Sequence, residues 1–313
     1  MATRPARLLV IGDVAWDILV RPERELVWGS DVFGRVELMP GGAAANVAVW
    51  ARRIGAEVTL VGKVGDDTLG ELMLRHLRAE GLSTEIPVVP GKPTMRIGIV
   101  IDPRGEHGFV TDHSNPLSFS PSDLPTSLLD HTDCLFFNGY GIFTSRTAEF
   151  MRPILGEARR RGIPIAFDPS SFTLIGGYGP QRLLAELGPL DLLLANAEET
   201  RSLCQGEDPA TLGATARTVV VKEGADGASA FTSSQRWRAE PAPAIVVDTT
   251  GAGDAFDAAY LVEYLASGSV DAALAAGNKL GAYVASHVGA QPKHWASPFA
   301  TSPSGQARPR PAH

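Results

Sequence analysis

The 313-residue sequence contains only two cysteines, Cys134 and Cys204. Two thiols cannot form the disulfide framework of a small secreted domain, and neither has a partner at metal-ligand spacing. Both lie beside apolar residues, so we expect them to be buried and chemically silent. Basic residues are also in the minority, with 28 Lys and Arg against 35 Asp and Glu and a net charge of −7. This balance argues against a nucleic acid or an anionic membrane as the main partner.

The chain also lacks a long apolar run. The apolar residues near the N-terminus follow a short basic tip and are too few for a membrane-spanning helix, and no signal-peptide cleavage pattern follows them. We therefore expect a cytoplasmic protein that does not bind membranes. The composition, 44% hydrophobic and 20% charged, is that of a soluble globular protein, and the length is sufficient for a large buried core.

Two common nucleotide-binding signatures are absent. The sequence has no GxxxxGK[ST] P-loop, and it has no GxGxxG between a strand and a helix with an acid downstream. The second absence disfavours a dinucleotide-dependent oxidoreductase. If the protein binds ATP, another kind of glycine turn must hold the phosphates.

Such a turn is present in the sequence DTTGAGD at residues 248–254. The apolar run AIVV enters it from residue 244 and a helical pattern follows, so we predict a strand, a glycine turn and a helix. Glycines allow the backbone to approach a ligand, and the free N–H groups of a helix start favour an anion. Asp254, in the first helical turn, could accept a proton beside that anion, as phosphoryl transfer to a hydroxyl requires. The alternative is an ordinary helix start with Asp254 as a surface acid.

Strand-like and helix-like segments alternate along most of the chain. The strands, for example DCLFFNG and LDLLLAN, are almost continuously apolar. This predicts an α/β fold in which a mostly parallel sheet is covered by helices on both faces. Residues 14–40 and 95–112 break the alternation with turns and β segments, and we expect them to form a small β lid. No linker divides residues 1–295, which we predict to be one domain, and we expect residues 296–313 to be disordered.

Polar residues stand where several of the predicted strands end. Asp13 and Asp17 follow the first strand, and each could be a ligand or an ordinary loop or surface acid. Asn46 lies one turn inside an alanine-rich helix, where its amide is unfavourable unless it has a polar partner such as a ligand hydroxyl pair. Asn196 and Glu199 could hold a hydrated Mg²⁺ at a strand end, or they could simply cap the next helix.

Three histidine and amide positions carry weaker signals. His76, in a predicted helix that has Leu69, Leu72, Met73 and Leu77 on one face, is expected at the surface. His113 and Asn115 follow the predicted lid, where a ligand contact is the less favoured interpretation.

Together these motifs resemble those of the ribokinase-like (PfkB) carbohydrate kinases over about residues 6–292. The family's second signature is matched by DTTGAGDAFDAAY, and an NxxE element and a strand–KxGxxG segment precede it in the expected order. Its first signature is matched within residues 41–65 by Gly41, Gly42, Asn46, Ala48, Gly55 and Gly65.

The resemblance implies a three-layer α/β/α domain with a β lid that phosphorylates a sugar-like alcohol with ATP and Mg²⁺. It implies that Asp254 is the base and that Gly251, Ala252 and Gly253 form the anion hole. The implied substrate residues are Asp13, Asp17, Gly41, Gly42 and Asn46. Asn196 and Glu199 would serve Mg²⁺ and phosphate, Glu199 through water. The implied nucleotide residues are Lys222, Gly224, Gly227 and Asn278. Asp248 and Thr250 match positions that hold a monovalent cation, K⁺, in ribokinases.

The sequence departs from the family patterns in ways that leave the substrate open. GGAAAN lacks the Lys-Gly of the ribokinase GGKGAN, and FDPSSF lacks the Asn and Arg of the fructokinase FDPNxR. Arg96 follows Thr94 by two residues, so the arginine patterns of sugar-phosphate kinases are not matched either. A nucleoside kinase is the alternative within the fold. A non-catalytic sugar or nucleotide sensor would be expected to lose the acid or a glycine, and this chain keeps both.

Two further expectations concern the tail and the lid. Lys293 replaces the serine that follows GAQP in ribokinases, so either it points into solvent and K⁺ binds at Asp248, or its ammonium takes the place of the ion. Apolar residues such as Val32, Phe33 and Ile97, if exposed on the lid, would offer a homodimer contact.

Overall fold

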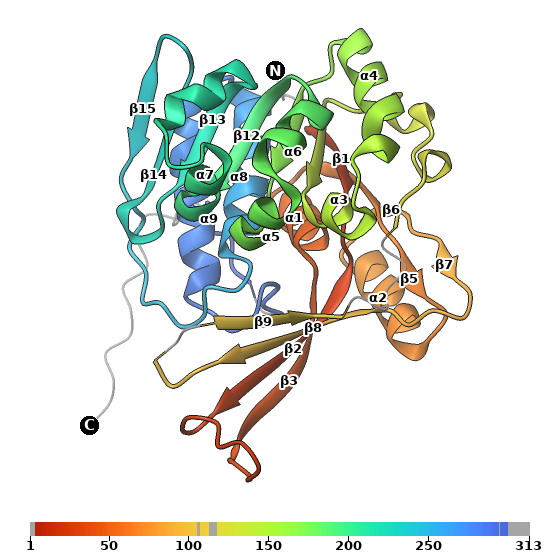
Figure 1. Cartoon of the computed structure of the whole chain (residues 1–313), viewed down its shortest axis with the longest axis vertical. Coiled ribbons are helices and arrows are strands. Elements are labelled where there is room, and N and C mark those ends of the chain that lie inside the picture. The colour runs from red at the N-terminus through yellow and green to blue at the C-terminus, as the bar shows by residue number, and fades with distance from the viewer. Residues whose placement is uncertain (1–3, 105–106, 113–117, 294, 300–313) are drawn as a thin grey trace, which may run out of the picture.

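The computed structural model describes residues 4–104, 107–112, 118–293 and 295–299 (Figure 1). A nine-stranded sheet forms its centre. In spatial order the strands are β15 (Arg236–Ala239), β14 (Ala228–Phe231), β13 (Ala216–Lys222), β12 (Leu190–Asn196), β11 (Ile165–Asp168), β10 (Cys134–Asn138), β1 (Arg7–Ile11), β4 (Glu57–Val61) and β6 (Ser83–Glu85). All pairs from β13 to β6 are parallel, whereas the β13–β14 and β14–β15 pairs are antiparallel, so β14 is the one strand of this sheet that runs against the others. The predicted mostly parallel sheet is confirmed.

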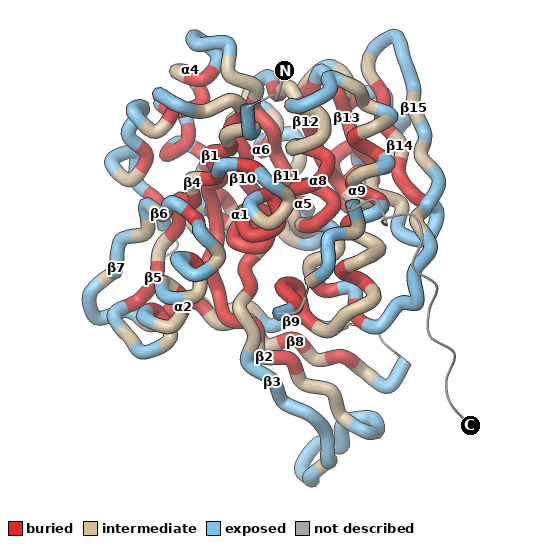
Figure 2. Tube along the Cα trace, turned by 180° about the vertical axis from the view of Figure 1, so that it is seen from behind, coloured by how far each residue is buried: buried red, intermediate tan, exposed pale blue. Residues whose placement is uncertain are grey.

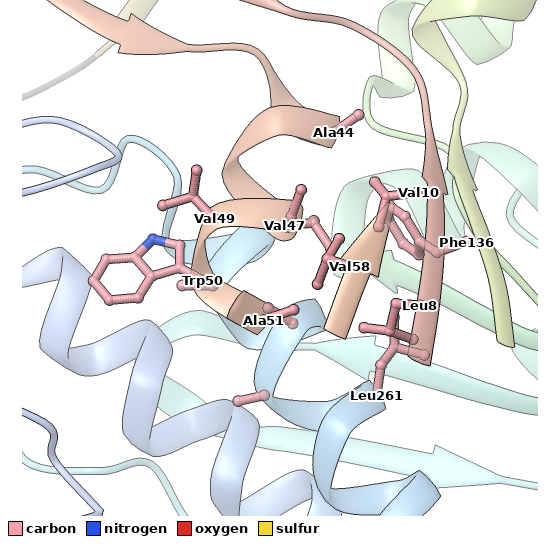
Figure 3. Packing of buried hydrophobic residues seen from close by; sticks show 14 of the residues in the cluster. Leu8, Val10, Ala44, Val47, Val49, Trp50, Ala51, Val58, Phe136 and Leu261 are labelled. Atoms are coloured by element: carbon pink, nitrogen blue, oxygen red, sulfur yellow. The ribbon is translucent and has the colours of Figure 1, made fainter. Parts of the chain in front are cut away.

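Both faces of this sheet are covered, which explains its continuously apolar strands. Side chains alternate along each strand, so Leu8 and Val10 face one hydrophobic core whereas Leu9 and Ile11 face the other. The first core lies under α1 (Ala43–Arg53), α2 (Thr68–Ala79), α8 (Ala252–Ser267) and α9 (Val270–Ala285), and Figure 3 shows its α1 and α8 side. The second lies under α3 (Tyr140–Ser145), α4 (Arg152–Arg161), α5 (Phe172–Tyr178), α6 (Pro180–Leu187) and α7 (Ala197–Leu203). Figure 2 shows the buried residues concentrated in the strands between these layers.

The two cysteines lie in different cores, Cys134 in the first and Cys204 in the second, and both are free thiols. Their predicted burial is confirmed. Minor elements complete the main body: strands β5 (Val64–Gly65) and β7 (Val88–Val89) pair with each other, and 3₁₀ turns lie at Pro121–Asp123, Thr126–Leu129, Glu149–Met151, Pro209–Ala214 and Gly224–Asp226. Within the described residues, no helix combines the length and the apolar character that crossing a membrane requires.

A second, four-stranded sheet, which we call the lid, has the order β3 (Gly34–Gly41), β2 (Ala15–Pro22), β8 (Met95–Ile101) and β9 (His107–Thr111). Its strands come from the two segments that the sequence singled out. Figure 1 shows it lying across one end of the main body, with the loop between β2 and β3 projecting away. Because β1 runs directly into β2, the lid covers the carboxyl-terminal end of the central strands.

The predicted strand before the glycine turn is wrong. Residues 240–247 form no strand, and Ile245 is 86% exposed. Pro241 and Pro243 have no N–H to give to a ladder, and β15 already ends the sheet on this side. The segment instead runs in an extended path toward α8. The expectations for His113, Asn115 and most of the tail fall on residues outside the described ranges.

Candidate active site

A cavity of about 1140 Å³ opens between the lid, the carboxyl ends of the central strands, α1 and α8. All the predicted site residues line it except Gly41 and Asp248. Gly41 lies directly behind one of them, because a Cβ at Gly41 would be 2.2 Å from Oδ2 of Asp17. Glycine at this position therefore makes room for the Asp17 carboxylate. This grouping at the strand ends is the usual place for ligands in open α/β sheets.

Asp254 stands in the first turn of α8 and faces the cavity. Its Oδ2 accepts a hydrogen bond of 2.7 Å from Nδ2 of Asn46. Partial removal from solvent raises the pKa of Asp254 to about 7, against the opposing hydrogen bond from Asn46. The charges of Asp168 and Asp13 raise this pKa further, and Lys222 lowers it. A carboxylate that titrates near neutral pH suits a general base.

The glycine turn before α8 presents free donors beside this acid. Gly251 has φ +74, and a Cβ there would lie 2.4 Å from Cβ of Ala290, so only glycine fits. The N–H of Ala252 donates to the Thr249 carbonyl, whereas those of Gly253 and Asp254 have no partner among the described residues. These two amides and the positive end of the helix form a site for an anion.

Gly253 differs from Gly251. Its φ is not positive, and a Cβ there would meet only Nζ of Lys222, at 3.6 Å. Alanine at Gly253 would therefore not be strained. What glycine preserves at this position is open space in front of the free amides.

The two N-terminal acids have different environments. Both oxygens of Asp13 are used: Oδ2 accepts from Ala43 N–H, and Oδ1 accepts from Ala44 N–H and from Nδ2 of Asn138. Asp13 thus caps the start of α1, where Gly42 as N-cap has no side chain to do so. Asp17 is 3% exposed, lines the cavity, and makes no hydrogen bond to a described residue.

Burial is the main cause that raises the pKa of Asp17 to about 8, and the charges of Asp13, Asp254 and Asp248 add to it. A buried acid without a protein partner is costly unless a ligand satisfies it. Asp17 is therefore the stronger of the two candidates for binding a substrate hydroxyl. Asn138, which the sequence analysis did not identify, acts on Asp13.

Asn46 has a protein partner on each side of its amide. Besides its bond to Asp254, its Oδ1 accepts 2.7 Å from Nε2 of Gln291, which is 1% exposed. The amide that the sequence assigned to a ligand is thus already satisfied by the protein on those two atoms. Its unfavourable place in a helix is explained by these contacts.

Asn196 and Glu199 form the helix cap that the sequence left as an alternative. Oδ1 of Asn196 accepts from the Glu199 N–H, and Oε2 of Glu199 accepts from the Asn196 N–H, both at 2.8 Å. The other oxygen of Glu199, Oε1, has no partner among the described residues, and Glu199 lines the cavity. Burial, with the charge of Asp168, raises the pKa of Glu199 to about 7. One free carboxylate oxygen near an anion site fits a hydrated Mg²⁺ that keeps most of its waters.

Lys222 ends β13 below the glycine turn. Its Nζ lies 2.6 Å from Asp168 and 3.1 Å from both oxygens of Asp257. Burial lowers the pKa of Lys222, but the two acids outweigh it and raise that pKa overall. This buried cluster sits under the start of α8. Neither acid stands out as a site residue in the sequence, although Asp168 lies in FDPSSF and Asp257 in DAFD.

Gly227 and Asn278, both predicted for the nucleotide site, contact the backbone at the end of β15. A Cβ at Gly227 would lie 2.2 Å from the Ala239 carbonyl oxygen, so glycine allows β15 to pass closely. Nδ2 of Asn278 donates to the carbonyls of Ala239 and Glu240 and so joins α9 to the same place. Gly224, in contrast, has open space around it. All three predicted residues also line the cavity.

Asp248 lies outside the cavity, behind the glycine turn. Its Oδ1 accepts from the Thr250 N–H, and its Oδ2 accepts from the Gly289 N–H and, at 2.6 Å, from Arg21 of the lid. Nε2 of His107, also on the lid, lies 3.6 Å from Oδ1. Burial raises the pKa of Asp248, but these hydrogen bonds and the Arg21 charge outweigh it and lower that pKa. Neither lid residue could be identified from the sequence, because nothing in the local pattern pairs β2 with a residue 227 positions later.

This arrangement does not fit a K⁺ ion on Asp248. The carboxylate already accepts three N–H donors, and one of them, the Arg21 guanidinium, carries a full positive charge. Lys293 is exposed and forms no ion pair with Asp248. The hydroxyl of Thr250 is buried without a partner among the described residues. That oxygen alone could serve an ion, but a cation at Asp248 would have to displace Arg21.

Comparison with known proteins gives consistent results. A model of the pfkB family of carbohydrate kinases matches residues 6–296. The ATP-dependent ribose-1-phosphate kinase of Halopiger xanaduensis is 29% identical over 288 residues, which cover 91% of this chain and 94% of that protein. The solved adenosine kinase of Sinorhizobium meliloti has a TM-score of 0.82 at 23% identity, with 93% of this chain and 97% of that chain covered. A protein of E. coli described as ribokinase II, solved with ATP and Mg²⁺, has a TM-score of 0.77 at 21% identity, with 91% and 94% covered. The predicted three-layer fold is confirmed.

Proposed function

The chain belongs to the pfkB family of carbohydrate kinases, and we propose that its cavity transfers the γ-phosphoryl group of ATP to a hydroxyl of a small sugar-like substrate. One observation carries this proposal. The carboxylate of Asp254 and the free N–H groups of Gly253 and Asp254 belong to one helix turn and face one cavity. A proton acceptor and an anion site so close together suit phosphoryl transfer, where positioning and charge stabilisation dominate.

The roles of the side chains follow from their partners. Asp17, which has no hydrogen-bond partner among the described residues, binds hydroxyls of the substrate. Asp254 accepts the proton of the reacting hydroxyl as its oxygen bonds to phosphorus, and the amides of Gly253 and Asp254 stabilise charge on the transferring group. Asn46 holds the Asp254 carboxylate in place.

The other end of the cavity suits the nucleotide. Pro241, Ala242, Val246 and Ala282 line it with apolar surface next to Asn278. Glu199, through its free oxygen, would hold Mg²⁺ by way of water, and the ion would neutralise phosphate oxygens. We assign no K⁺ to the site, since Arg21 already supplies the positive charge at Asp248.

A nucleoside is the second candidate for the acceptor. The lid contributes Ile97, Ile99 and Phe109 to the cavity, an apolar surface that a flat base would contact and a free sugar would not use. A phosphorylated sugar is less suited, because the basic side chains that the described residues place on the cavity wall are Lys222 and the imidazole of His107. Lys222 is committed to Asp168 and Asp257, and His107 lies near Asp248.

We also propose that a second copy of the chain covers the outer face of the lid. The strand register brings Ile18, Leu38 and Val110 into one row on that face and Val20, Val36 and Val100 into the next. Val36 and Val110 are each 70% exposed and Leu38 49%, with no charged side chain in either row. Phe33, beside them, is 86% exposed, whereas Ile97 faces the cavity and is not part of this surface.

The function is tested by measuring ADP release from ATP and Mg²⁺ against pentoses, hexoses, 2-keto-3-deoxygluconate and nucleosides. Asp254→Asn should keep its fold and most of its substrate affinity, and its kcat should fall by roughly 10²–10⁴. A variant that retains more than half of wild-type turnover would remove Asp254 as the base. If the wild-type protein binds a sugar or ATP yet releases no ADP with any acceptor, a sensor becomes the better explanation.

A further inference from the structure

A continuous line of hydrogen bonds runs from α2 to Asp254. Nε2 of His76 lies 2.7 Å from Oε1 of Gln291, Nε2 of Gln291 donates to Oδ1 of Asn46 at 2.7 Å, and Nδ2 of Asn46 donates to Asp254 at 2.7 Å. The expectation that His76 is merely a surface residue is wrong, since it is half-buried and bonded. Gln291, which belongs to the GAQP pattern, bonds through its side chain to Asn46 of α1 and His76 of α2.

The chemistry of each group fixes the direction of this line. An ionised carboxylate only accepts, so Asn46 must present its NH₂ group to Asp254 and turn its oxygen away. That oxygen needs a donor, which is the NH₂ group of Gln291. The oxygen of Gln291 then needs a donor in turn, and only a hydrogen on Nε2 of His76 can supply it. Every dipole therefore points its positive end toward Asp254.

We propose that His76 and Gln291 are positioning residues for the base: through Asn46 they hold a donor against the Asp254 carboxylate and favour its ionised form. This rests on the proposed role of Asp254. A hydrogen bond to the charged form of an acid lowers its pKa, which here opposes the effect of burial. The other charged groups that act on Asp254 are Asp168, Lys222 and Asp13.

The surroundings hold the line in place without taking part in it. On either side of Gln291, Nε1 of Trp50 donates to the Ala290 carbonyl and Arg53 donates to the Pro292 carbonyl. At the outer end, His76 interacts electrostatically with Glu80, which caps the end of α2 and is paired with Arg53. The side-chain amides of Asn46 and Gln291 each have a partner on both sides. A substitution at His76 therefore acts on Asp254 through these hydrogen bonds rather than through a new charge.

Two measurements on the full chain test the proposal, and neither needs turnover. The ¹⁵N shifts of His76 at pH 8 should show the Nε2–H tautomer, and an Nδ1–H tautomer would overturn the assigned direction. The Asp254 carboxyl pKa, followed by ¹³C NMR, should rise by about 0.5–1 unit in Gln291→Met and by a smaller amount in His76→Leu. His76→Gln, which retains a donor, should restore much of the wild-type value.

Trp50→Phe is the matched control, because it removes a tether of the same segment but leaves the line intact. It should lower the melting temperature without moving the Asp254 pKa. If Gln291→Met does not fold, the His76→Leu and His76→Gln pair decides the question alone. An Asp254 pKa equal to wild type in folded Gln291→Met or His76→Leu refutes the proposal. In an active enzyme the same shift would lower kcat at pH 6 by about 3- to 10-fold with little change in KM. If the wild-type protein shows no kinase activity, that result would count against the proposed function and not against the line of hydrogen bonds.

Discussion

Replacement of Arg21 by alanine should convert a kinase that ignores K⁺ into one that K⁺ activates. In the wild type, Asp248 is fully buried and its Oδ2 lies 2.6 Å from Arg21, whose side chain is 24% exposed. Loss of one partner of a buried ion pair costs about 3–5 kcal/mol. We expect the low end of that range, because Arg21 is partly solvated and two backbone N–H groups still serve the carboxylate.

The effect on turnover follows from the position of Asp248. Its Oδ1 accepts from the Thr250 N–H, so it fixes the turn that leads to the free amides of α8. With Arg21 gone, the turn should loosen and kcat should fall about 10- to 100-fold in tetramethylammonium, an ion too large for the site. K⁺ can take the vacated place, with the Thr250 hydroxyl, which no described residue bonds, as a further oxygen, and should restore much of the activity.

The assay is ADP release with the best acceptor at constant ionic strength, with K⁺ replaced stepwise by tetramethylammonium. Arg35→Ala is the matched control, since Arg35 lies opposite Arg21 on β3 but is exposed and forms no ion pair within the described residues. It should respond like the wild type. Strong K⁺ activation of the wild type, or full activity of Arg21→Ala without K⁺, would refute the reasoning.

Four further predictions concern the acids, the glycines and the lid. Turnover should fall as the pH drops through about 7, because the pKa of Asp254 is raised to that value and the base must be ionised; a pH profile of kcat flat from 5 to 8 would contradict this. The pKa of Asp17 is about 8 in the folded protein and near 4 in the unfolded chain, so the wild type should lose stability as the pH rises from 4 to 8. Asp17→Asn removes this loss and should therefore be increasingly more stable than the wild type toward pH 8, as denaturant titrations at pH 5 and 8 would measure. Gly253→Ala should fold normally and lose most of its turnover. Gly55→Ala, at φ +105 with open space around it, should instead lose about 1 kcal/mol of stability and keep its turnover. Similar behaviour of the two variants would mean that the glycine turn before α8 is purely structural. Substrate should slow hydrogen exchange in β2, β3, β8 and β9, because closure of a lid excludes water; exchange unchanged in all four strands would remove that role.

The sequence was informative where function depends on local pattern. Periodicity and glycine placement located the central sheet, the turn at Gly251 and the acid at Asp254, because strand ends and helix starts are determined by neighbouring residues. The two lid segments were recognisable because they interrupt the alternation. The helix cap formed by Asn196 and Glu199 could be predicted as an alternative because it, too, depends on residues only three positions apart.

Contacts between distant segments could not be read in this way. Arg21 bonds to Asp248, His76 to Gln291, and Lys222 to Asp168. In none of these pairs does the local sequence around either residue indicate its distant partner. The run AIVV has strand-like residues but no neighbouring edge to join, so propensity alone gave the wrong element. Strand propensity reflects how well a residue packs in a sheet, and here there is no sheet to pack in.

The late position of Gln291 has a consequence for biosynthesis. Trp50 bonds to a carbonyl 240 residues further on, and Asn46 bonds to a side chain 245 residues further on. In an emerging chain, β1, β4 and α1 can form early. The bonds from α1 to residues 290 and 291 cannot form until the segment after α9 has left the ribosome. Such distant closures make folding slow, and they make it nearly all-or-none at its last step. A nascent chain that stops short of residue 290 would already contain every glycine of the turn and the Asn46 that bonds to the base, and yet nothing would orient that asparagine.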